Sequence, residues 1–301
     1  MPAVSNGKGE GMRMGNRRHL VRLYWSRLRA EGPTRSAARI VSSPSRIVRH
    51  LRRLISGDAG ALSNWYAPSA SIAADIQFVA RALRVEPAEV ERAFAELDGD
   101  DAFMSDVRAR YASVRSDQGD RFDPGRFRTL YAFVRLGAPR TAIETGVHDG
   151  LSSALILRAM ERNGKGALVS IDLPSPDLPP GTDGPGWLVA EELRRRWTLV
   201  IGDSRVELGR IARERAPVDL FLHDSDHSRR HREFEFRTVR EYLAPNGVLL
   251  SDDDDAPDTL LDELAQEWSM VHGRCGPVGH HGPCIGALTS PPGGGEPGEG
   301  P

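Results

Sequence analysis

The stretch TAIETGVHDGLS at residues 141–152 decides the fold class of this chain. Its first residues predict a short strand, and Gly146 and Gly150 follow directly after it. Glycine allows a sharp backbone turn and a close approach to a ligand, because no Cβ is in the way. The serines after Gly150 suit the start of a helix. A strand, a glycine turn and a helix in this order are typical of the ligand-binding end of a parallel α/β sheet.

The chain around this turn alternates between predicted strands and predicted helices. Residues 127–137 have the pattern of a helix that ends at Gly137, before Pro139. The alternation that follows predicts an α/β fold with a doubly wound sheet. We expect strands at residues 141–144, 167–172, 197–201, 219–223, 247–251 and 284–289, and helices at residues 151–162, 189–196, 205–215, 230–243 and 260–268.

The length of 301 residues predicts a core domain with a smaller accessory region. Residues 1–60 hold 13 Lys and Arg against 3 Asp and Glu, and we expect a basic, partly disordered arm there. Such an arm can contact nucleic acid or an anionic membrane, but a solvated tail is the simpler interpretation. We expect a helical accessory region at residues 61–125, the core at residues 126–290, and a flexible tail of Gly, Pro and Glu at residues 291–301.

Composition also bears on the location of the protein. No apolar run approaches the roughly 18 residues that cross a bilayer, and the N-terminus lacks the apolar stretch of a signal peptide. We therefore expect no membrane span and a cytoplasmic location. The two cysteines, Cys275 and Cys284, imply no disulfide framework. Together with His280 and His281 they could hold zinc, but their spacing fits no standard zinc site.

The acid before the glycine turn indicates the charge of the ligand. A dinucleotide site of the form G-x-G-x-x-G needs a third glycine, which disfavours a nicotinamide-dependent dehydrogenase. Here the turn has the form G-x-x-x-G, and Glu144 lies two residues before it. Glu144 would repel an anion and attract a cationic sulfonium. Asp172 and Asp203 lie at the ends of the next two strands, where they could bind ribose hydroxyls and an adenine amine, or cap helices instead.

Five short motifs follow one another in a familiar order: residues 144–152, 170–172, 202–204, 219–227 and 243–247. Together they resemble the motifs of class I S-adenosylmethionine-dependent methyltransferases, above all a bacterial branch with D-x-D-H-S after strand four and a P-G-G turn before strand five. Asn246 replaces the first glycine of that turn. The resemblance implies a Rossmann-like, doubly wound, seven-stranded sheet with its last strand antiparallel, and S-adenosylmethionine as cofactor. The cofactor-binding residues that it implies are Glu144, Thr145, Gly146, Gly150, Ser152, Asp172, Asp203 and Ser204.

Acidic residues cluster after the fourth and fifth of these core strands. Asp224 follows one strand, and Asp252 and Asp253 follow the other. Because adjacent strand ends meet at one edge of a sheet, these carboxylates would repel one another unless a proton, a cation or solvent relieves them. A hard divalent cation such as Mg²⁺ is the economical solution. The pattern is also similar to metal-dependent catechol-type O-methyltransferases, which implies Asp224, Asp252 and Asp253 as metal ligands, with Asp253 standing where that family has Asn.

His227 is the candidate general base of the predicted site, because imidazole titrates near working pH. Asp224, three residues before it, is the second catalytic candidate. His223 and His231 lie four residues on either side of His227. Three histidines on one helix could form a zinc site, but residue 223 ends a strand, and for these two a solvated histidine without a role is the simpler interpretation. For Asp254 we likewise expect a solvated loop acid or a helix N-terminal role.

The leading hypothesis is an enzyme that methylates the hydroxyl of a small molecule in secondary metabolism, with S-adenosylmethionine as donor and a divalent cation assisting. One alternative is a metal-free methyltransferase that acts on oxygen or nitrogen with His227 as base. A less favoured alternative is a nucleic-acid-binding protein with a vestigial cofactor fold, which the basic arm suggests. The sequence is also compatible with a homo-oligomer.

Overall fold

A computed structural model describes residues 72–114, 127–174, 178–179, 182–252, 254, 259–275 and 285–291. They all belong to one compact unit that spans residues 63–301. The predicted basic arm at residues 1–60 lies outside the described residues, and so do Asp253, His280, His281, Cys284 and the predicted tail beyond Pro291. Within the described part of the chain, no helix combines the length and the apolar character needed to cross a membrane.

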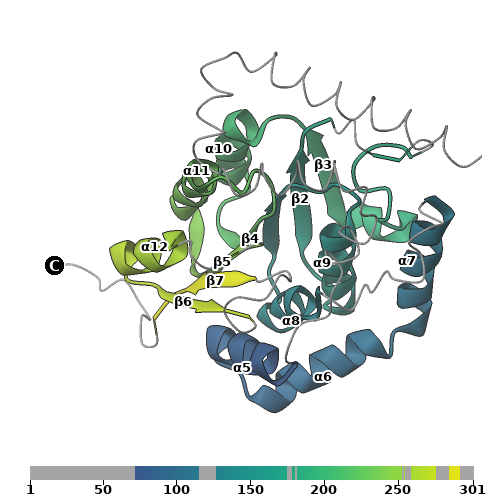
Figure 1. The fold of residues 1–301 in the computed structure, drawn as a ribbon, viewed down its shortest axis with the longest axis horizontal. Coiled ribbons are helices and arrows are strands. Elements are labelled where there is room, and N and C mark those ends of the chain that lie inside the picture. Colours follow the sequence, from purple (N-terminus) through teal and green to yellow (C-terminus); the bar gives the residue numbers. More distant parts are fainter. Residues whose placement is uncertain are drawn as a thin grey trace, which may run out of the picture. The chain divides into compact units, whose positions relative to one another are not determined.

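A seven-stranded sheet forms the centre of the described structure, with the strand order β3-β2-β1-β4-β5-β7-β6 (Figure 1). Strands β1 to β5 are parallel, whereas β7 is antiparallel to both β5 and β6. The predicted seven-stranded sheet with a reversed last strand is therefore confirmed. The strands are β1 Thr141–Thr145, β2 Ala167–Asp172, β3 Trp197–Ile201, β4 Val218–His223, β5 Leu243–Ser251, β6 Val271–Arg274 and β7 Gly286–Thr289.

Helices cover both faces of the sheet, as a doubly wound fold requires (Figure 1). Alternate strand residues enter two separate hydrophobic clusters: Ala142 packs in one with Leu155, and Ile143 packs in the other with Leu208. This alternation is the period of two expected of a strand that is buried on both faces. The first cluster contains α8 Arg128–Gly137 and α9 Leu151–Arg162, and the second contains α10 Ser204–Glu214, α11 Arg229–Arg240 and α12 Leu260–Trp268.

Three details of the predicted elements were wrong. The helix expected at residues 189–196 is a 3₁₀ helix, η4 Glu191–Arg196, in which only Leu193 is buried. The helix expected to reach residue 243 ends at Arg240, because β5 already begins at Leu243 and pairs there with Val218. Strand β6 was not predicted from the sequence pattern, because its residues VHGR contain a single strong strand former, Val271, and no apolar alternation.

The described part of the predicted accessory region consists of helices α5 Ile72–Leu83, α6 Pro87–Asp98 and α7 Asp101–Val114. Pro87 begins α6 and Gly99 caps its end, which are the positions where these two residue types are typical of helix ends. These helices share the hydrophobic cluster of α8 and α9. Phe78 of α5, for example, meets Phe133 of α8 edge to face, with ring centroids 5.4 Å apart. The accessory helices thus extend the core rather than forming a core of their own.

A buried carboxylate joins the accessory helices to α9. Asp100 lies just before α7 and is 7% exposed. Arg158 donates to it from Nε at 2.7 Å and from Nη2 at 3.0 Å, and Arg162 donates from Nη2 at 2.9 Å. Burial raises the pKa of Asp100, but the hydrogen bonds from the two arginines outweigh burial and hold that pKa below its ordinary value. The charged carboxylate therefore stabilises the folded state.

We expect Asp100→Ala to lower the free energy of unfolding by about 2 kcal/mol, because hydrogen bonds to a buried charge are lost. Asp106→Ala removes the exposed pair with Arg110 on α7 and should change it by less than about 0.5 kcal/mol. Urea unfolding measures both. The lowered pKa means that the stabilisation by Asp100 is present above the ordinary carboxyl range and is lost as the pH falls through the folded value. If the difference in the free energy of unfolding between the two variants stays the same in acid, this account is contradicted.

Candidate active site

The candidate site lies at the carboxyl ends of four adjacent strands. Hydrogen bonds continue the sheet beyond these ends: the amide of Gly146 donates to Ile171, that of Asp224 to Thr145 at 2.8 Å, and that of Asp252 to the carbonyl of His223 at 2.8 Å. The glycine turn after β1, the acid that ends β2 and the acids after β4 and β5 therefore meet at one edge. This is the edge where open parallel sheets bind ligands.

The two glycines of the turn are required by geometry. Gly146 has φ +84° and Gly150 has φ +91°, both in the left-handed region. A Cβ on Gly146 would lie 2.1 Å from the carbonyl oxygen of Asp224, and a Cβ on Gly150 would lie 2.5 Å from Cα of Gly186. The space beside Gly146 is therefore filled by the backbone that follows β4, so a larger side chain would displace protein as well as any ligand.

The turn is held by an acid from the neighbouring strand. Oδ2 of Asp172 accepts hydrogen bonds from the amides of Val147 at 3.0 Å and His148 at 2.8 Å. Beside it, Leu173 is 43% exposed, and Ile201, the β3 partner of Asp172, is 49% exposed. The predicted contact of Asp172 with a ribose stays a prediction, and the structure adds its role in shaping the turn.

Glu144, predicted to contact the cofactor, lies inside the protein. Its side chain is fully buried, and its oxygens accept from Ser152 and Ser153 of α9 at 2.5 Å each and from Ser170 of β2 at 2.6 Å. Burial raises the pKa of Glu144, against the effect of the three hydroxyls. Because serine hydroxyls enclose both oxygens, these hydrogen bonds give no support for a direct contact of Glu144 with a sulfonium. Glu144 and Ser152 instead fasten the turn to α9 and β2.

The remaining predicted cofactor residues also make contacts within the protein. Thr145 is buried and donates from Oγ1 to Glu235 at 2.6 Å. Asp203 caps α10 by accepting from the amide of Arg205 at 2.9 Å, so the alternative capping role is confirmed. The hydrogen bond from the Arg205 side chain lowers the pKa of Asp203. Ser204 Oγ lies 3.0 Å from Nε2 of His231. Cofactor contact by these residues stays a prediction.

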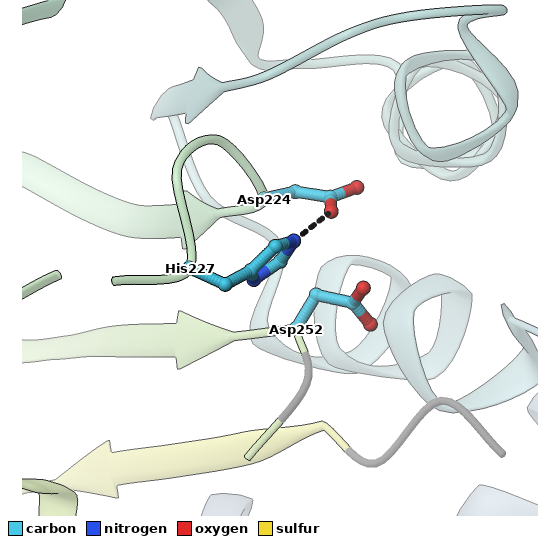
Figure 2. A group of neighbouring side chains, drawn as sticks. All are labelled: Asp224, His227 and Asp252. Atoms are coloured by element: carbon cyan, nitrogen blue, oxygen red, sulfur yellow. Dashed lines mark ion pairs between the residues drawn. The ribbon is translucent and has the colours of Figure 1, made fainter. Parts of the chain in front are cut away.

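Figure 2 shows three side chains that point toward one another at the ends of β4 and β5: Asp224, His227 and Asp252. Each offers one atom that could bind a metal ion, and these atoms lie within 4.8 Å of one another. Nε2 of His227 is 3.8 Å from Oδ1 of Asp224, and the two side chains are 20% and 26% exposed. The sequence predicted Asp224 and Asp252 here as metal ligands and His227 as a base, and the structure brings all three together.

Three residues around the cluster that were interpreted as solvated are buried or mostly buried. His223 is fully buried and His231 is mostly buried, and both contact Glu235 on α11. Asp254, expected to be a solvated loop acid, is 1% exposed and lies 2.9 Å from Nε2 of His272. The solvated interpretation was wrong because α11 and β6 contact these residues, and the packing between elements is not contained in a single motif. The H-x-x-x-E spacing of His231 and Glu235 was the available signal.

The loop that contains Gly186 and Trp187 packs on the glycine turn, and this contact was not predicted from the sequence. The amide of Gly186 donates to the carbonyl of His148 at 2.8 Å, and the indole of Trp187 donates to Oδ1 of Asp149 at 2.9 Å. The same indole stacks on Tyr111 of α7, with ring centroids 6.2 Å apart. Accessory helix α7 is thereby connected to the turn through one tryptophan. The segment has no motif that would have identified this role.

Comparison with known proteins gives one match to a family model. Residues 143–253 match the model of a methyltransferase domain family. No curated protein matches the chain in sequence. The match begins within β1, includes β2 to β5 and the candidate cluster, and indicates a methyltransferase domain in this part of the chain.

Several solved structures are similar to the chain at low identity. The O-methyltransferase TomG from Streptomyces achromogenes is 15% identical, with 61% of this chain and 90% of that chain covered and a TM-score of 0.43. An O-methyltransferase from Bacillus cereus is 17% identical, with 71% and 96% covered and a TM-score of 0.41. The methyltransferase PaMTH1 from Podospora anserina is 13% identical, with 62% and 88% covered and a TM-score of 0.44. Similarity this low transfers no residue role to this chain.

We expect Gly146→Ala to destabilise the protein by about 3 kcal/mol, because it combines a left-handed φ with a clash against backbone. Gly164→Ala is the matched control. Gly164 also has a positive φ, +65°, but a Cβ there would meet no atom within 4 Å, so only the conformational cost of about 1 kcal/mol remains. Urea unfolding of both variants tests this. Equal losses in the free energy of unfolding would show that the clash with the Asp224 carbonyl does not destabilise the protein.

Proposed function

We propose that this chain is an S-adenosylmethionine-dependent methyltransferase that transfers a methyl group to a hydroxyl of a small molecule. The observation that carries the proposal is the turn from Gly146 to Gly150, shaped by Asp172, beside the cluster at the ends of β4 and β5. The methyltransferase-domain match over residues 143–253 supports it. S-adenosylmethionine would supply an electrophilic methyl group when bound.

The residues of the turn fit such a cofactor in three ways. Gly146 and Gly150 allow the left-handed backbone of a tight turn, which places the turn beside the acids at the ends of β2, β4 and β5. Asp172 keeps lone pairs that could accept hydrogen bonds from ribose hydroxyls, because each carboxylate oxygen accepts more than one bond. Leu173 and Ile201 offer exposed apolar surface beside Asp172, which an adenine ring would cover.

We expect Asp172→Asn to weaken binding of S-adenosylhomocysteine by about tenfold or more, because an amide cannot replace the charged acceptor toward both the turn and the ribose. Asp219→Asn is the matched control. Oδ2 of Asp219 also accepts from two backbone amides, those of Arg140 and Thr141, but at the opposite end of β1. Titration calorimetry should give unchanged affinity for this control. Equal affinity in both variants would place the cofactor elsewhere.

The cluster of Asp224, His227 and Asp252 fits a divalent cation, since two carboxylates and an imidazole converge within 4.8 Å. Asp253 lies outside the described residues, and its role as a ligand stays a prediction. A bound Mg²⁺ or Mn²⁺ would lower the pKa of a substrate hydroxyl. The carboxylates of Asp224 and Asp252 would hold the ion and so orient the acceptor oxygen toward the glycine turn.

The second candidate is a metal-free enzyme in which His227 takes the proton of the acceptor. The observation in its favour is the partly exposed imidazole, which lies 3.8 Å from the Asp224 carboxylate and could be oriented by it. The two roles exclude each other at Nε2, because a lone pair that binds a metal ion cannot also accept a proton. The two candidates can therefore be separated by experiment.

A screen of phenols and alcohols for methylated product by mass spectrometry would first identify an acceptor. We then expect chelation to abolish turnover and Mn²⁺ to restore it. Calorimetry with Mn²⁺ alone should show that Asp252→Asn weakens metal binding by about tenfold or more, while affinity for S-adenosylhomocysteine changes little. Full turnover after exhaustive chelation, with an inactive His227→Gln variant, would decide for the metal-free enzyme.

A further inference from the structure

A single buried carboxylate lies at the centre of the polar contacts behind the candidate site. Glu235 on α11 is 0% exposed, although glutamate is rarely buried unless it is paired. Four side chains surround its two oxygens, and none of these contacts is used in the proposed chemistry. The contacts are His223 Nδ1 at 2.6 Å, Thr145 Oγ1 at 2.6 Å, His231 Nε2 at 2.8 Å and Ser225 Oγ at 3.0 Å.

The partners of Glu235 come from the segments that carry the site. Thr145 is the last residue of β1 and directly precedes Gly146. His223 is the last residue of β4 and directly precedes Asp224. Ser225 follows Asp224 in the loop that leads to His227. One carboxylate therefore holds the glycine turn and the loop of Asp224 and His227 at a fixed distance from each other.

The contact with His231 extends this network to a third strand. Nε2 of His231 lies within hydrogen-bond distance of both Glu235 and Ser204, the first residue of α10. Ser204 begins the helix that follows β3. Glu235 thus connects segments that follow β1, β3 and β4, all at the carboxyl edge of the sheet.

Glu235 also decides which nitrogen of His223 carries a proton. Burial raises the pKa of Glu235, but the hydrogen bonds from the two histidines outweigh burial and hold the pKa well below its ordinary value. A carboxylate only accepts hydrogen bonds, so Nδ1 of His223 must be the donor. The other ring nitrogen, Nε2, is buried and has no hydrogen-bond partner among the described residues. The His223 ring meets the ring of His227 edge to face, with centroids 5.5 Å apart.

We propose that Glu235 is a positioning residue of the active site: it fixes the glycine turn against the loop of Asp224 and His227, and it holds His223 in the tautomer with the proton on Nδ1. This inference rests on the proposed function for its consequence in cofactor binding, but the tautomer of His223 does not depend on it. A residue that served only to stabilise the fold would have no effect on that tautomer.

The test compares Glu235→Gln with Glu233→Gln, the same change on the same helix at a residue whose side chain is 40% exposed and pairs with Arg237. The amide of glutamine brings two donors into a place where four donors already converge, so the network cannot stay intact. We expect Glu235→Gln to weaken binding of S-adenosylhomocysteine at least about tenfold, by calorimetry, through displacement of Thr145 and the turn. Glu233→Gln should leave the affinity unchanged.

The second readout is the ¹⁵N spectrum of the histidine rings, assigned with a His223→Gln variant. In the wild type, Nε2 of His223 should resonate as an unprotonated nitrogen and Nδ1 as a protonated one. In Glu235→Gln this pattern should become a mixture of tautomers. Val239→Ala, which removes packing on the same helix face without touching the carboxylate, should lose stability and keep the tautomer.

Unchanged affinity together with an unchanged His223 tautomer in folded Glu235→Gln would overturn the inference. If Glu235→Gln does not fold, Thr145→Val and Ser225→Ala each remove one hydrogen bond and should each give a smaller loss of affinity, and full affinity in both would equally overturn it. A wild-type chain that binds no S-adenosylhomocysteine would contradict the proposed function instead. The tautomer measurement would then still decide the role of Glu235.

Discussion

The end of β1 is held from both faces of the sheet by buried carboxylates, and the geometry of the candidate site depends on this constraint. Consecutive strand residues point to opposite faces, so Glu144 enters the side of α9 and Thr145 enters the side of α11. On the first side the carboxylate belongs to Glu144 itself, and three serines satisfy it. On the second side it belongs to Glu235. A buried charge is tolerated only when hydrogen bonds replace its lost hydration, which explains why hydroxyls and imidazoles gather at these two points.

This constraint also explains what the sequence could and could not predict. The strands and the glycine turn were predicted because apolar periodicity and glycine spacing are local properties. The face toward which a strand-end residue points depends on the register with the neighbouring elements, which a single sequence does not contain. Glu144 was therefore predicted at the strand end where it lies, but the three serines that enclose its carboxyl were not predicted, and its contact with a cofactor stays a prediction. The burial of Glu235 was not predicted, because a His and a Glu four residues apart on a helix have the same sequence pattern whether they are exposed or buried.

The accessory helices pack directly against the elements that form the candidate site. They share the hydrophobic cluster of α8 and α9, and they are fixed to α9 through Asp100. Through the stacking of Tyr111 on Trp187, and the hydrogen bond of Trp187 to Asp149, α7 also supports the glycine turn directly. A boundary between accessory region and core, drawn from composition near residue 125, thus separates segments that pack together. Changes in α7 can therefore affect the glycine turn through the contact of Tyr111 with Trp187.

Enclosure of Glu144 changes the electrostatic argument for a cationic ligand. Its carboxyl is enclosed by serine hydroxyls, and burial raises its pKa, so the acids that a ligand at the edge can reach are the partly exposed Asp172, Asp224 and Asp252. These acids lie on both sides of the glycine turn, and a sulfonium above the turn would be attracted to them. A divalent cation between Asp224 and Asp252 would be attracted to the same acids. The two cations repel each other. The metal ligands must therefore neutralise most of the charge of the ion before a sulfonium is attracted to this edge. A third carboxylate, such as Asp253 where the catechol-type family has Asn, would supply that neutralisation.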